Sequence, residues 1–63
     1  MPVITFETSP MSKEQKRQVA EGFTRVASEA TGIPEGAFYV FIKENESDNV
    51  GVGGKLLSDR HEG

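Results

Sequence analysis

Residues 37–44 are predicted to form a strand with apolar side chains on both faces, and this feature limits how the chain can fold. One face carries Phe38, Val40 and Ile42, and the other carries Tyr39, Phe41 and Lys43. A strand of this kind is typical of a sheet that is covered on both sides. The rest of the chain predicts only one helix, which can cover only one face. We therefore expect other copies of the chain to cover the second face.

The length of the chain supports the same expectation. Its 63 residues form at most one domain, spanning residues 1–63. Domains this small are commonly stabilised by disulfides, by metals or by oligomerisation. Cysteine is absent, and a single histidine, His61, argues against a structural zinc site. Oligomerisation is the remaining source of additional stability.

The expected element order is strand, helix, strand. Residues 3–7 alternate β-branched and aromatic side chains between two faces and predict the first strand. Ser12 and Gln15 form a capping-box pattern at the start of a helix, and Gly32 is placed to end it in the left-handed conformation. Between them runs one apolar stripe at helical spacing, formed by Val19, Phe23, Val26, Ala27 and Ala30. Two strands joined by a helix predict a parallel pair with a right-handed crossover.

The glycine-rich segment 51–54 is expected to bend the chain or to form a short hairpin. A phosphate-binding loop would need glycine at position 49 and serine or threonine at position 56, where the chain has Asn49 and Leu56. Leu56 and Leu57 could add an edge strand to a neighbouring copy. The predicted fold class is α/β: a βαβ subunit with a parallel strand pair and a C-terminal glycine-rich hairpin segment, assembled into an oligomer.

Charge and hydropathy narrow the range of partners. Seven Lys and Arg residues against ten Asp and Glu residues give a net charge of −3, which argues against nucleic-acid binding. No apolar run approaches the roughly 20 residues of a membrane span. The first residues lack the basic region of a signal peptide, so a cytoplasmic location is expected.

Pro2 offers a route to acid–base chemistry. A small residue in the second position permits removal of Met1, which would leave a secondary amine at the terminus. An α-amino group has a reference pKa of about 7.7–8.0, and burial or neighbouring cations lower such a pKa. A neutral amine near pH 7 is a good general base. The alternative is an ordinary Met-Pro start without a catalytic role.

Several motifs together resemble the 4-oxalocrotonate tautomerase family (2-hydroxymuconate tautomerase-like), and the resemblance covers nearly the whole chain. They are Pro2 before a strand, residues 12–16 opening the helix, Ile33 and Pro34 before the second strand, and residues 50–56. The resemblance implies a hexamer, built as a trimer of dimers. It also implies an amino-terminal proline that acts as general base in the enol–keto interconversion of small 2-oxo acids, without cofactor or metal.

Three positions depart from the catalytic set of the best-known family members. Those members carry arginine where this chain has Met11 and Tyr39, and phenylalanine where it has Val50. The resemblance therefore implies Pro2 and Tyr39 as catalytic residues, with Met11 and Val50 lining the pocket. A tyrosine hydroxyl can donate one hydrogen bond to an enolate oxygen, a weaker substitute for a bidentate arginine. We expect weak tautomerase activity.

Other functions stay open at this point. The chain could be a non-catalytic binding or structural member of the family, or a proline-dependent hydratase or dehalogenase. Positive charge could reach the site from a neighbouring copy through Lys13, Lys43 or Arg60. The alternative for these cations is a solvated surface role.

Overall fold

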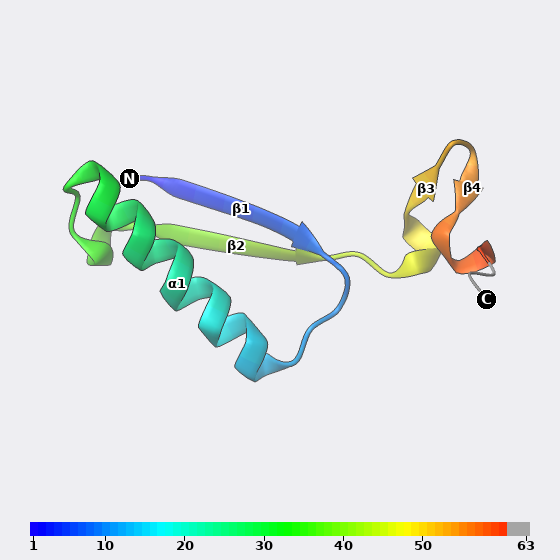
Figure 1. The fold of residues 1–63 in the computed structure, drawn as a ribbon, viewed down its shortest axis with the longest axis horizontal. Coiled ribbons are helices and arrows are strands. Elements are labelled where there is room, and N and C mark those ends of the chain that lie inside the picture. Colours follow the sequence, from blue (N-terminus) through cyan, green and yellow to red (C-terminus); the bar gives the residue numbers. More distant parts are fainter. Residues whose placement is uncertain (61–63) are drawn as a thin grey trace.

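The computed structural model describes residues 1–60, so His61 lies outside the described part of the chain. Its elements, shown in Figure 1, are β1 (Val3–Thr8), α1 (Lys13–Thr31), β2 (Tyr39–Glu44), β3 (Gly51–Val52) and β4 (Lys55–Leu56). Single 3₁₀ turns lie at Glu35–Ala37, Ser47–Asn49 and Leu57–Asp59. β1 and β2 are parallel neighbours, in register from Val3 beside Tyr39 to Thr8 beside Glu44. The predicted βαβ order and the C-terminal hairpin are confirmed.

The two ends of α1 are formed by the residues that the sequence indicated. The Gln15 N–H donates to Ser12 Oγ at 3.2 Å, and the Ser12 N–H donates back to Gln15 Oε1 at 2.9 Å. These bonds satisfy two donors that a helix start leaves free. At the other end Gly32 has a φ of 77°, and its N–H donates to the Ser28 carbonyl at 2.8 Å. Within residues 1–60, no helix has the length and apolar character needed to cross a bilayer.

β2 begins at Tyr39, so the predicted start at Ala37 is wrong. The Ala37 N–H donates to the Pro34 carbonyl at 3.0 Å, and the Phe38 N–H donates to the Glu35 carbonyl at 3.1 Å. Because these two donors close a local 3₁₀ turn, they are not available to the β1–β2 ladder. The first β2 residue to bond across is Tyr39, whose N–H donates to the Pro2 carbonyl at 3.0 Å.

α1 packs against one face of the strand pair and leaves the other face uncovered. On the covered face Ile4, Phe6, Val40 and Ile42 are half-buried. Phe6 contacts Phe23 of α1 edge to face, with ring centroids 5.3 Å apart and an interplanar angle of 88°. The uncovered face exposes Val3 by 51%, Tyr39 by 51% and Phe41 by 49%. The structure thus identifies the Tyr39–Phe41 side of β2 as the one without cover.

Residues 1–60 of the single chain do not form a complete core. Among residues 1–60 no side chain is fully buried, and Val26 of the predicted helix stripe is 59% exposed. The accessible surface is 4877 Å², against roughly 4,000 Å² for a compact protein of this mass. The radius of gyration is 15.3 Å, against about 11 Å expected for a compact chain of this length. These dimensions describe a chain that is more open than a compact globular protein of its length.

The hairpin extends away from the βαβ unit, at the opposite end of the molecule from the N-terminus (Figure 1). Gly51 pairs with Leu56 and Val52 with Lys55, so Leu56 forms its strand within the chain. The turn is made by Gly53 and Gly54, whose φ values are 62° and 87°. Positive φ at both central residues is typical of a type I′ turn, which matches the twist of the two flanking strands.

Candidate active site

Pro2 lies at the amino end of β1, directly beside the start of β2. Its carbonyl accepts the Tyr39 N–H at 3.0 Å, and Val3 is the register partner of Tyr39. Pro2 is half-buried, whereas Met1 is 80% exposed. A peptide bond to Met1 makes the Pro2 nitrogen an amide without basicity. Removal of Met1 would create a secondary amine at this edge of the sheet.

Tyr39 has its side chain on the uncovered face of the sheet. It is 51% exposed, and within residues 1–60 its hydroxyl makes no hydrogen bond. The structure therefore brings Pro2 and Tyr39 together at one end of the strand pair. It also leaves the phenol hydroxyl free to donate to another molecule.

Met11 and Val50 lie beyond the opposite end of the strand pair. Met11 follows β1, and Val50 follows β2 and its 3₁₀ turn. The six residues of β1 separate Pro2 from this region, a distance of about 20 Å at the rise of a strand. One chain therefore does not bring these two residues to Pro2 and Tyr39.

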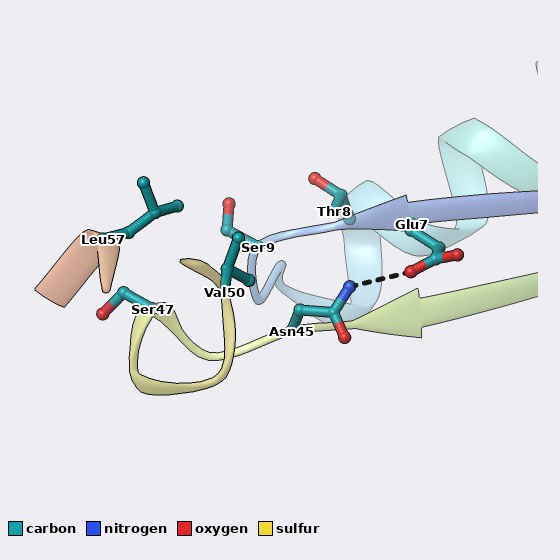
Figure 2. Close-up of a pocket in the computed structure, with 7 residues that line it drawn as sticks. All are labelled: Glu7, Thr8, Ser9, Asn45, Ser47, Val50 and Leu57. Carbon is teal, nitrogen blue, oxygen red and sulfur yellow. Dashed lines mark hydrogen bonds between the residues drawn. The ribbon is translucent and has the colours of Figure 1, made fainter. Parts of the chain in front are cut away.

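A hollow of about 260 Å³ lies at the carboxyl ends of β1 and β2, and it contains Val50. Its other lining residues, seen in Figure 2, are Glu7, Thr8, Ser9, Asn45, Ser47 and Leu57. Ligands of open α/β sheets bind outside the carboxyl ends of the parallel strands. We call this cavity the strand-end hollow.

Hydrogen bonds join the two strand ends that frame the strand-end hollow. The Asn45 N–H donates to the Thr8 carbonyl at 2.7 Å, and Asn45 Nδ2 donates to Glu7 Oε1 at 3.2 Å. The Leu57 N–H donates to the Val50 carbonyl at 2.8 Å and fixes the base of the hairpin. Hydrogen bonds therefore hold in place both the strand ends and the hairpin base that bound the hollow.

Glu44, the last residue of β2, anchors the segment that carries Met11. Its Oε2 accepts the Met11 N–H at 2.7 Å, and its Oε1 lies 2.9 Å from Lys16 Nζ. The hydrogen bond from Met11, followed by that from Lys16, lowers the pKa of Glu44 below its ordinary value of 4.5. Glu44 therefore has a structural task, and its two oxygens are already engaged.

Comparison with known proteins identifies the family. A family model described as tautomerase enzyme matches residues 2–60. The chain belongs to the tautomerase family. A Bacillus cereus protein described as a probable tautomerase is 43% identical over 61 residues, covering 95% of this chain and all of the relative. A Bacillus subtilis protein described as 2-hydroxymuconate tautomerase is 40% identical over 60 residues, covering 94% and 97% of the two chains.

Solved structures agree with this tautomerase-family assignment. A crystal structure described as a homologue of 4-oxalocrotonate tautomerase superposes with a TM-score of 0.88 at 38% identity, covering 95% of this chain and all of that one. A structure described as a heterohexameric 4-oxalocrotonate tautomerase from Chloroflexus aurantiacus has a TM-score of 0.86 at 22% identity, covering 97% of this chain and all of that one. The second shows the shared fold alone. Family membership supports an isomerase class for this chain.

The sequence of this tautomerase-family chain did not predict that Glu7 and Asn45 lie side by side. They lie 38 positions apart and meet only because β1 and β2 are parallel and in register. The available signal was their position, since each lies at the carboxyl end of a predicted parallel strand.

Proposed function

We propose that the chain is a cofactor-independent tautomerase that interconverts the enol and keto forms of small 2-oxo acids. The proposed general base is the amino group of Pro2 after removal of Met1. The observation that carries this proposal is the position of Pro2 at the amino end of the edge strand β1, where its carbonyl accepts the Tyr39 N–H and only Met1 precedes its nitrogen. Family membership supports the reaction type.

The proposed reaction moves one proton from the enol oxygen to carbon. The neutral Pro2 amine removes the proton of the enol hydroxyl, and the resulting ammonium returns a proton to carbon. Negative charge builds on the oxygen between these steps, and a donor at that oxygen lowers the barrier. The Tyr39 hydroxyl, which has no partner within residues 1–60, is the proposed donor.

A second copy of the chain is proposed to complete the site. β1 has β2 on one side only, so its other edge can pair with another strand. Two β1 strands that pair antiparallel about a two-fold axis place Pro2 of one copy near Thr8 and Ser9 of the other. Those residues line the strand-end hollow. This arrangement extends a marginal two-stranded sheet to four strands, consistent with the open shape of the subunit.

The test compares two forms of the protein, which intact-mass measurement distinguishes. One has lost Met1, and the other keeps one residue ahead of Pro2. Ultraviolet absorbance follows ketonisation of the enol of phenylpyruvate. We expect turnover by the processed form and none by the blocked form, because an amide nitrogen cannot accept the proton. Equal turnover by both forms would overturn the Pro2 mechanism, and no turnover by the processed form would favour a non-catalytic binding role.

A further inference from the structure

The described lining of the strand-end hollow carries one charge, and it is negative. Among the residues 1–60 that line it, Glu7 is the only one with an ionisable side chain. The remaining polar lining consists of the hydroxyls of Thr8, Ser9 and Ser47 and the amide of Asn45. Val50 and Leu57 provide the apolar wall. A ligand group in this hollow therefore meets hydrogen-bonding groups and a carboxylate, and no cation from the described part of the chain lines it.

Two cations of the described residues form ion pairs, and neither pair includes Glu7. Within residues 1–60 the ion pairs are those of Lys16 with Glu44 and of Arg17 with Glu14. Lys43 is the register partner of Glu7 on β2, yet it is absent from the lining of the hollow. Glu7 instead accepts a hydrogen bond from the neutral amide of Asn45 at 3.2 Å. No cation of residues 1–60 forms an ion pair with the Glu7 carboxylate.

We infer that Glu7 selects the substrate by the charge of its tail, admitting a neutral hydroxyl-bearing tail and rejecting a second carboxylate. The inference rests on the proposed function, in which the reacting end of the substrate lies at Pro2 of one copy and its tail in the hollow of another. A carboxylate tail beside Glu7 would place like charges together, a common device of selectivity. A hydroxyl tail would donate to Glu7.

The size of the hollow sets the size of the tail. A protein cavity of about 150 Å³ is known to hold benzene. The strand-end hollow, at about 260 Å³, therefore admits a group of phenol size. The structure points to the enol of a 2-oxo monoacid with a hydroxyphenyl tail. It does not favour a dicarboxylate such as 2-hydroxymuconate, the compound in the description of the Bacillus subtilis relative.

The experiment measures kcat/KM of the processed protein for the enols of 4-hydroxyphenylpyruvate and phenylpyruvate and for 2-hydroxymuconate. The three compounds differ in intrinsic reactivity. The decisive quantity is therefore the change, from wild type to variant, in the ratio of the kcat/KM values for two compounds. Glu7→Gln keeps an oxygen for Asn45 and removes the charge. We expect it to raise the ratio of dicarboxylate to hydroxyphenyl turnover about tenfold or more. Ser47→Lys, at an exposed position, adds a cation and should raise the same ratio.

Glu21→Gln is the matched control, because it removes the same charge from an exposed position on α1 outside the hollow. We expect it to leave the ratio unchanged. An unchanged ratio in Glu7→Gln, or an equal change in Glu21→Gln, would overturn the inference while leaving the proposed function in place. A wild-type preference for the dicarboxylate that Lys43→Gln abolishes would also overturn it. Absence of turnover of all three compounds by the processed protein would overturn the proposed function itself.

Discussion

The carboxylate of Glu44 holds the backbone N–H of Met11 at 2.7 Å across 33 positions of sequence. This bond fixes the end of β2 against the segment that enters α1. The second carboxylate oxygen of Glu44 forms an ion pair with Lys16 at 2.9 Å, and Lys16 lies in the first turns of α1. One side chain therefore joins the strand pair to the helix at the end of the sheet opposite Pro2.

This arrangement predicts a loss of stability in acid. Because the pKa of Glu44 is lowered in the folded state, its contribution is present above the ordinary value of 4.5 and is lost as the pH falls through the lowered value. We expect the denaturation midpoint to fall as the pH drops below about 4.5 and to depend less on pH in Glu44→Gln. Glu14→Gln, at an exposed pair, should keep the wild-type pH dependence. A parallel pH dependence in Glu44→Gln and wild type would contradict this assignment.

The helix start gives a second expectation. Ser12→Ala removes the oxygen that accepts the Gln15 N–H, and we expect a loss of about 1 kcal/mol in the free energy of unfolding. Chemical denaturation measures the loss. Ser58→Ala, in an exposed 3₁₀ turn, serves as the control and should leave the free energy unchanged. Equal effects of the two substitutions would show that the cap contributes nothing.

Phe23 is expected to contribute more to the free energy of unfolding than the helix cap at Ser12. Phe23→Ala removes the edge-to-face contact with Phe6, through which α1 packs on the covered face of the sheet. Phe→Ala substitutions in cores cost about 3–5 kcal/mol, and the half-buried state of Phe23 in the single chain favours the lower end. Denaturation midpoints that match the wild type would mean that α1 does not pack on this face.

The uncovered face of the sheet predicts that copies of the chain associate into an oligomer. Sedimentation at low micromolar concentration should show a multiple of the 6.9 kDa chain. Phe41→Glu places a charge on the uncovered face and should shift the protein toward smaller species, because burying an unpaired charge between copies is costly. Gln18→Glu adds the same charge on the exposed part of α1 and is the control. A folded wild-type species that stays at 6.9 kDa at every concentration would contradict the expectation.

Tyr39→Phe separates catalysis from stability. Since the hydroxyl has no partner within residues 1–60, its removal should leave the denaturation midpoint unchanged. If the hydroxyl stabilises the enolate oxygen, kcat should fall about tenfold or more. A variant with wild-type kcat would remove Tyr39 from the proposed mechanism.

The sequence predicted those features that local signals determine. Ser12 with Gln15 and Gly32 mark the two ends of α1, since each acts through backbone groups a few residues away. Periodicity predicted both strands. The start of β2 was misplaced because a 3₁₀ turn closed by Pro34 competes with strand pairing, and apolar alternation does not register such a turn.

The candidate site depends on contacts between distant residues, which the sequence pattern does not contain. Glu7 meets Asn45 only through the register of the parallel pair. The sequence pattern did not show which of the two apolar faces of β2 the helix covers. The packing of Phe23 on Phe6 shows that it covers the face of Phe6. Pro2 and Tyr39 were predicted as partners, and their adjacency is observed, whereas their role remains a prediction.

The turn at Gly53 and Gly54 has a consequence for chirality. A methyl group in the L configuration would meet no atom within 4 Å at either position, so the obstacle to L-alanine is backbone handedness and not crowding. Both φ values are positive, a region that L residues enter at a cost of about 1–2 kcal/mol and that their mirror images prefer. A synthetic chain with D-alanine at position 54 should therefore form the hairpin more readily than the natural chain, because D-alanine loses less conformational entropy than glycine on folding. The hairpin tip thus contains a position whose backbone conformation favours a D residue over an L residue.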